Sequence, residues 1–124
     1  MVGLTHVDAV IRPVGTGSPG YRAQFLVDTG ATDSMAPGAA LSAAGILRRG
    51  RRAYELADGR RVTYEWGLAE IEFAGEVTAG RVLFGPDGVE PLLGVTALES
   101  AGLVVDPATG NLRRLPAIPL KASA

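Results

Sequence analysis

One aspartate, Asp28, stands where an apolar stretch of the sequence gives way to small polar residues. Three apolar residues, 25–27, precede it, and Thr29 and Gly30 follow it. If this stretch forms a buried strand, Asp28 lies at the edge of a low-dielectric core, where an isolated carboxylate keeps its proton more readily. Thr29 can donate a hydrogen bond, and Gly30 lets the backbone approach closely. The plain alternative is an aspartate that caps a turn, because short motifs recur by chance.

The remaining residue types argue against most other hydrolytic and metal chemistries. His6 is the only histidine and cysteine is absent, whereas serine and cysteine hydrolases of the usual kind need a histidine base. Metal binding needs several clustered ligands, so we expect neither a metal site nor another cofactor. The glycine-rich stretch 15–20 lacks the lysine and the helix of a phosphate-binding loop, and we interpret it as a turn.

Length and composition are those of one packed domain. The 124 residues are 47% hydrophobic and 20% charged, which allows a core and argues against disorder. The net charge of -1 attracts neither nucleic acid nor a membrane surface, and no apolar run approaches the ~20 residues of a membrane helix. The first ten residues lack a signal-peptide pattern, and the absence of cysteine permits a reducing compartment. We therefore expect a cytoplasmic protein.

Glycine and proline separate short apolar runs, which is typical of many short strands joined by turns. This pattern predicts an all-β fold with one or two short helices. Asp58 and Gly59 lie between two strand-like stretches and give a strong hairpin signal. Thr96 and Glu99 resemble a capping box that opens a helix. We expect strands at 4–13, 23–27, 54–56, 61–64, 68–73, 81–84, 92–94, 103–105 and 112–115, and helices at 37–44 and 96–102.

Two stretches of the sequence, 41–47 and 98–104, resemble each other. Each has a helix end, a glycine and an apolar exit, and each follows an apolar strand that ends in glycine, at Gly30 and at Gly94. Either helix ends simply look alike, or the domain is built from two related strand-turn-helix halves. The sequence leaves both interpretations open.

Several motifs together resemble retropepsin-like aspartic peptidases. Residues 25–31 resemble the family signature, in which apolar residues precede Asp-Thr-Gly-Ala, and residues 91–94, Pro-Leu-Leu-Gly, resemble its second marker. Residues 71–75 and 82–86 resemble the strands that follow the flap of retroviral peptidases. The resemblance covers residues 23–115 and implies a closed, acid-protease-like β-barrel lobe with a flap hairpin. We expect the lobe to span 1–116 and the tail, 117–124, to be loose.

The resemblance also implies roles for single residues. Asp28 would be the catalytic carboxylate, Thr29 would brace the paired carboxylates across a dimer, and Gly30 would offer its carbonyl to the substrate backbone. Residues 92–94 would support the active-site loop from behind, and the hairpin at 58–59 would be the flap that covers the substrate. The expected catalytic residues are thus Asp28, Thr29 and Gly30, and the expected substrate-binding residues are Ala31, Thr32, Asp33, Ala57, Asp58, Gly59 and Leu92.

One such chain supplies only half of the chemistry. An aspartic peptidase needs two carboxylates that share one proton, one acting as base toward water and the other as acid toward the carbonyl oxygen. No other aspartate precedes Thr-Gly, and the chain lacks room for a second lobe. A homodimer brings Asp28 to its own copy across a two-fold axis. Residues 112–115 would be either an interleaved dimer strand or an ordinary edge strand.

The sequence therefore predicts an aspartic endopeptidase whose substrate is an extended peptide or protein. Two departures from the retroviral pattern motivate an alternative. Thr32 and Val95 stand where retroviral members carry an acidic residue and an arginine, and the hairpin tip 57–61 is charged and lacks a run of glycines. The alternative is a catalytically inactive peptide-binding or dimerisation module with the same fold.

Overall fold

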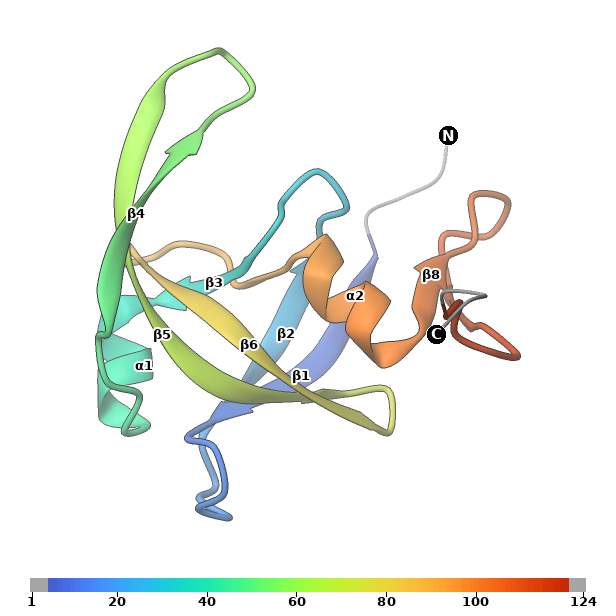
Figure 1. The fold of residues 1–124 in the computed structure, drawn as a ribbon, viewed down its shortest axis with the longest axis horizontal. Helices are drawn as coiled ribbons and strands as arrows, with labels where there is room; N and C mark the ends of the chain where they lie inside the picture. The colour runs from blue at the N-terminus through green and yellow to red at the C-terminus, as the bar shows by residue number, and fades with distance from the viewer. Residues whose placement is uncertain (1–4, 121–124) are drawn as a thin grey trace.

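The computed structural model describes residues 5–120 and shows a chain built mostly from β-strands, with two short helices (Figure 1). Figure 1 shows the strands wrapped around one centre, with a long hairpin projecting from one side. The elements in chain order are β1 (His6–Arg12), β2 (Tyr21–Val27), β3 (Ser34–Pro37), α1 (Gly38–Ala43), β4 (Gly50–Glu55), β5 (Arg61–Phe73), β6 (Glu76–Gly85), β7 (Leu92–Leu93), α2 (Val95–Ala101), β8 (Leu103–Val105) and β9 (Leu112–Arg114).

Six strands close into a barrel. Their order is β1-β2-β7-β3-β6-β5, and β5 pairs back with β1 to complete the ring. The short strand β7 lies between β2, to which it is parallel, and β3, to which it is antiparallel. Closure satisfies the backbone along the ring and leaves it no open edge. The predicted all-β fold with a closed acid-protease-like barrel is confirmed.

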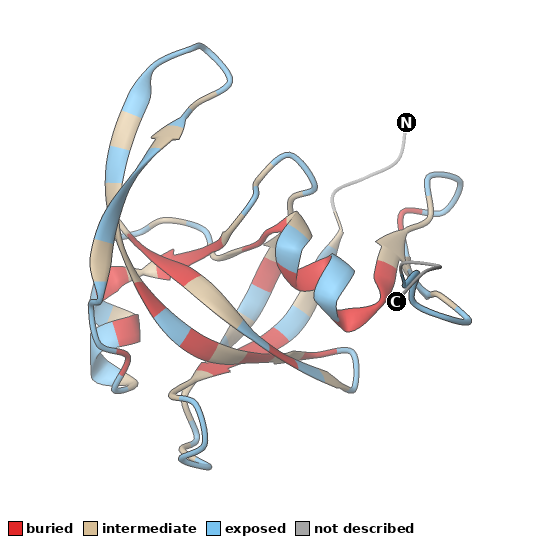
Figure 2. Cartoon of the chain, in the orientation of Figure 1, coloured by how far each residue is buried: buried red, intermediate tan, exposed pale blue. Residues whose placement is uncertain are grey.

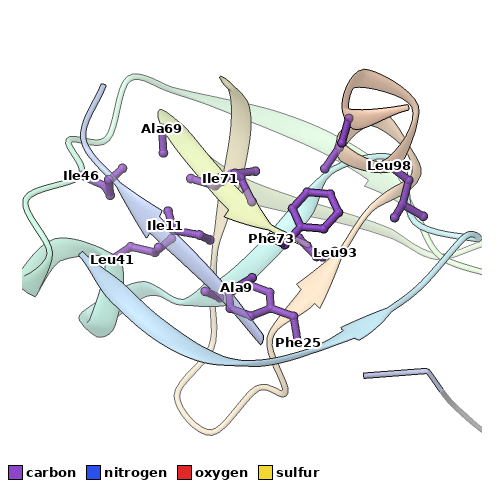
Figure 3. Close-up of a cluster of buried hydrophobic side chains, with 14 of the residues drawn as sticks. Ala9, Ile11, Phe25, Leu41, Ile46, Ala69, Ile71, Phe73, Leu93 and Leu98 are labelled. Atoms are coloured by element: carbon purple, nitrogen blue, oxygen red, sulfur yellow. The ribbon is translucent and has the colours of Figure 1, made fainter. Parts of the chain in front are cut away.

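Large apolar side chains fill the interior of the barrel (Figure 3). Phe25 and Leu93 are 0% exposed, and they come from the neighbouring strands β2 and β7. Ala69, Ile71 and Phe73 point inward at every second position of β5, and the bands of burial in Figure 2 follow the same alternation. Burying each large side chain contributes about 1.5–3 kcal/mol, so this core is the main source of stability.

Both predicted helices are present, but the predicted capping box is wrong. Helix α2 begins after Gly94, which is the N-cap and offers no side-chain hydrogen bond, and Thr96 already lies inside the helix. Close packing explains the glycine, because a Cβ at position 94 would lie 2.6 Å from the carbonyl carbon of Asp33. The C-terminal cap is as expected, with Gly102 in the left-handed region at φ 73°. Within residues 5–120, no helix is long and apolar enough to cross a membrane.

Strand β4 and the first part of β5 form the projecting hairpin (Figure 1). Its turn holds Gly59 at φ 88°, which confirms the hairpin predicted at Asp58 and Gly59. The stretches 61–64 and 68–73, expected as separate strands, instead form the single strand β5, which serves the hairpin at one end and the barrel at the other. Gly67 permits this continuity, because a Cβ there would lie 2.4 Å from the carbonyl oxygen of Leu47.

A second, two-stranded sheet of β8 and β9 lies beside the barrel. The guanidinium group of Arg114 on β9 donates to the carbonyl oxygen of Ala74 at 3.0 Å and pairs with Glu76, which ties this hairpin to the β5–β6 turn. Strand β9 thus pairs within its own chain, over three of the four residues expected at 112–115. The boundary at residue 116 stays a prediction, and residues 121–124 of the expected tail lie outside the described residues.

Candidate active site

Asp28 lies directly after β2, in a tight turn fixed by its own backbone and side chain. Its backbone N–H donates to the carbonyl oxygen of Leu93 at 2.9 Å, and its carbonyl oxygen accepts from Ala31 at 3.1 Å. The Oδ1 atom accepts from the N–H of Gly30 at 3.0 Å, which fixes the orientation of the carboxylate. Asp28 is half-buried, whereas Thr29 and Gly30 are exposed.

The strand that leads to Asp28 is less buried than the apolar run suggested. Only Phe25 of the three preceding residues is buried, and Leu26 and Val27 are half-buried. A run buried on both faces needs a covering layer on each side, and the outer face of β2 has only a partial one. The condition considered for this stretch, a buried strand, is therefore met only at Phe25.

The segment around Gly94, which contains the second family marker, contacts the active-site loop, residues 28–33, which carries Asp28. The N–H groups of Val95 and Thr96 donate to carbonyl oxygens of residues 31 and 32, at 2.8 and 3.2 Å. The N–H of Gly94 donates to the Oγ of the buried Ser34 at 3.0 Å. These bonds tie the loop and the start of β3 to the start of α2.

A cavity of about 420 Å³ opens beside Asp28, between the active-site loop and the β4–β5 hairpin. The expected site residues that line it are Asp28, Gly30, Ala31, Thr32, Asp33, Ala57 and Leu92. Thr29, Asp58 and Gly59 do not line it. Asp58 lies at the hairpin tip instead, where the backbone N–H and the guanidinium group of Arg60 lower the pKa of its carboxyl group.

The cavity is also lined by residues that the sequence analysis did not assign to it. Met35 and Leu83 are buried but lie outside the barrel core, and they form its apolar floor. Their positions on strands adjoining the loop are the only signal that could have identified them. The hairpin contributes four more lining residues, which are Tyr54, Glu55, Leu56 and Tyr64.

One of these residues links the hairpin to the loop. The Tyr54 hydroxyl donates to Oδ2 of Asp33 at 2.5 Å, the length of a hydroxyl–carboxylate hydrogen bond. Burial of the ring raises the pKa of Tyr54 to about 12, and the hydrogen bond to Asp33 and its negative charge add to the shift. Tyr54 therefore keeps its proton at neutral pH and can donate this hydrogen bond.

Comparison with known protein families decides the assignment. Residues 19–100 match the family described as gag-polyprotein putative aspartyl protease. The chain belongs to this aspartyl protease family. The matched stretch contains Asp28, the whole β4–β5 hairpin and Gly94. A search of curated proteins found no match.

Membership of the aspartyl protease family agrees with the donor set around the cavity. Within residues 5–120, no three side chains of histidine, aspartate or glutamate form a cluster that could hold a metal ion. The polar groups of the cavity are mainly carboxylates and tyrosine hydroxyls. Such groups bind and transfer protons, which is the chemistry that an aspartyl protease requires.

Proposed function

We propose that this protein is an aspartic endopeptidase that works as a homodimer, with Asp28 of each subunit supplying one carboxylate. The observation that carries the proposal is the placement of Asp28 on a loop bonded to Leu93, Val95 and Thr96, at the wall of a cavity beside a hairpin. Membership of the aspartyl protease family supports a protease-type function in general. The dimer and the catalytic step are our inference from the chemistry.

In the proposed mechanism, the two Asp28 carboxyl groups hold one proton between them. The ionised carboxylate removes a proton from a water molecule, whose oxygen attacks the peptide carbonyl carbon. The protonated carboxyl gives its proton to the carbonyl oxygen. The carboxyl that took the water proton then gives it to the peptide nitrogen, the carbon–nitrogen bond breaks, and one hydroxyl proton of the tetrahedral intermediate passes to the other carboxylate, which restores the shared proton. The N–H of Gly30 orients Asp28 throughout by its bond to Oδ1.

Thr29 supports the dimeric form of the proposal. It is exposed, and within residues 5–120 its hydroxyl makes no hydrogen bond. An exposed hydroxyl beside a catalytic carboxylate is well placed to bond across a two-fold axis, where residue 29 meets its own copy. The free hydroxyl is what a bracing role between subunits requires.

The hairpin formed by β4 and β5 would act as a flap over an extended substrate. Ala57, near its tip, and Leu92, on the barrel side, line the same cavity. Substrate backbone bound between flap and loop could pair like a strand, while alternate side chains enter the apolar floor of Met35 and Leu83. Peptide or protein chains are therefore the proposed substrates.

The alternative function is a catalytically inactive module that binds peptides or dimerises. The charged tip of the hairpin favours it, because Asp58 and Arg60 pair with each other and not with the lobe. Thr32 and Val95 also leave the loop without the ion pair of retroviral members. This module would keep the cavity but would not need the carboxylate of Asp28.

Sedimentation combined with a peptide-library digest separates these functions. The wild-type chain and Asp28→Asn are compared at mildly acidic pH, where a shared proton is available. The peptidase proposal expects a dimer in both proteins and cleavage only in the wild type. A folded, dimeric wild type that cuts no peptide between about pH 3 and 7 would contradict it. Peptide binding retained without cleavage would favour the inactive module.

A further inference from the structure

The tip of the β4–β5 hairpin is stabilised from within and has few contacts with the barrel. The N–H of Leu56 donates to the carbonyl oxygen of Arg60 at 2.8 Å, and the N–H of Gly59 donates to that of Leu56 at 2.9 Å. Asp58 and Arg60 form an ion pair within the same turn. Residues 57–61 are all exposed. These contacts preserve the shape of the tip but leave its height above the cavity undetermined.

Tyr54 makes the contact that fixes this height. Its hydroxyl reaches from β4 to the Asp33 carboxylate, which belongs to the active-site loop. The Tyr54 ring also lies 6.1 Å from the ring of Tyr64 on the other arm, and 5.9 Å from the guanidinium of Arg52. The ring thus lies along one face of the hairpin, beside one residue of each arm, and Tyr54 itself pairs with Val62 of β5, so that moving the hydroxyl moves the hairpin.

The other end of this contact is rigid. The residues on both sides of Asp33 are held, because the carbonyl oxygen of Thr32 accepts from Thr96 and the Oγ of Ser34 accepts from Gly94. No side chain fits at position 94 beneath this backbone. The hydrogen bond therefore joins an exposed hairpin, which is a mobile type of element, to the fixed backbone around Asp33.

We propose that Tyr54 is a positioning residue, whose hydroxyl sets the closed position of the flap through Asp33 of the same chain. The inference rests on the proposed function, because it concerns the flap of that site. When the bond breaks, the flap lifts and opens the cavity to an incoming peptide. When it forms, the hairpin covers the cavity. The closed state is thus selected within one subunit.

The test uses an Asp28→Asn background, in which no cleavage can occur, and measures ¹⁵N relaxation of the hairpin amides. Tyr54→Phe removes only the hydroxyl. Tyr64→Phe is the matched control, because Tyr64 lines the same cavity and its hydroxyl makes no hydrogen bond within residues 5–120. Loss of a bond to a charged acceptor should raise the open population of the hairpin about ten-fold in Tyr54→Phe. The control should match the background protein.

A double variant tests whether Asp33 is the partner. Tyr54→Phe and Asp33→Ala together should mobilise the hairpin no more than either change alone, because both remove the same bond. In the active chain, Tyr54→Phe should raise KM more than it lowers kcat. Hairpin relaxation that is unchanged by Tyr54→Phe would overturn the inference. Because relaxation is measured without catalysis, that result is distinct from a failure to cleave peptides, which would instead contradict the proposed function.

Discussion

The backbone N–H of Asp28 donates to the carbonyl oxygen of Leu93, so that the two family motifs, at 25–31 and 91–94, are directly hydrogen-bonded to each other. Parallel pairing of β2 with β7 sets this register, with Val27 opposite Leu93. Asp28 consequently lies at the end of one strand with its backbone bonded to the neighbouring strand, while the N–H of Gly30 holds its carboxylate. The position of residue 28 is therefore set by strand pairing in the barrel together with the turn that follows it.

Gly94→Ala should destabilise the fold and displace the active-site loop. The added Cβ would meet the carbonyl carbon of Asp33 at 2.6 Å and the carbonyl oxygen of Thr32 at 2.7 Å. Overpacking of this kind costs about 1–3 kcal/mol. Denaturant unfolding measures the loss, with Gly80→Ala as the control, because a Cβ at Gly80 meets nothing within 4 Å. Equal free energies of unfolding for the two variants would show that the loop backbone accommodates the added Cβ without cost.

Ser34→Ala should lower the free energy of unfolding by about 1–3 kcal/mol, since the buried N–H of Gly94 loses its acceptor. Ser34 is 2% exposed, so water cannot readily replace the lost oxygen. Chemical denaturation of the variant provides the measurement. The exposed Ser42→Ala serves for comparison and should change stability by less than about 0.5 kcal/mol. A loss at position 34 no larger than at position 42 contradicts this account of the loop.

Stability should fall at alkaline pH through Tyr54. Its pKa of about 12 in the folded chain lies above the ordinary tyrosine value of 10.0, so the unfolded chain loses this proton first. The contribution is fully present below pH 10 and disappears as the pH rises toward 12. After solvent screening of this half-buried group, it amounts to about 1 kcal/mol. Unfolding measured from pH 9 to 12 should show a shallower decline for Tyr54→Phe, and parallel curves would refute the claim.

Thr29→Ala should weaken the dimer without unfolding the subunit. Thr29 is exposed in the single chain, so the subunit itself loses nothing buried. Sedimentation should show a dimer constant weaker by about ten-fold, as expected for one lost hydrogen bond in each subunit. Thr29→Ser keeps the hydroxyl and should restore both association and cleavage. An unaltered dimer constant in Thr29→Ala would remove this residue from the proposed interface.

The sequence predicted the elements whose signals are local. The alternation of Ala69, Ile71 and Phe73 indicated a half-buried strand, and Asp58 and Gly59 located the hairpin turn. The resemblance of the motifs around Asp28 and Gly94 to a known family then predicted the barrel and the loop. A family resemblance implies which distant strands pair, whereas the periodicity of a sequence does not. The parallel alignment of β3 with β6, for example, has no local signature.

Other features depend on how distant segments meet. Tyr54 looked like one aromatic residue on a strand, and its bond to Asp33 follows only from the angle at which the hairpin crosses the loop. Thr96 carried the local pattern of a cap, yet close packing at Gly94 moved the start of the helix. Met35 and Leu83 look like core residues in the sequence, and only the three-dimensional arrangement assigns them to the cavity.

The insertion of β7 between β2 and β3 has a consequence for synthesis on the ribosome. The ring cannot close until Leu93 has emerged, although β1 and β2 were made long before. Until then the nascent chain carries unpaired strand edges, which invite aggregation. The pairing of β1 with β5 also joins residues far apart in the sequence, such as Ala9 and Phe73, which slows folding. A chain that ends before β7 would therefore expose unpaired strand edges and tend to aggregate, and it would not form a smaller barrel.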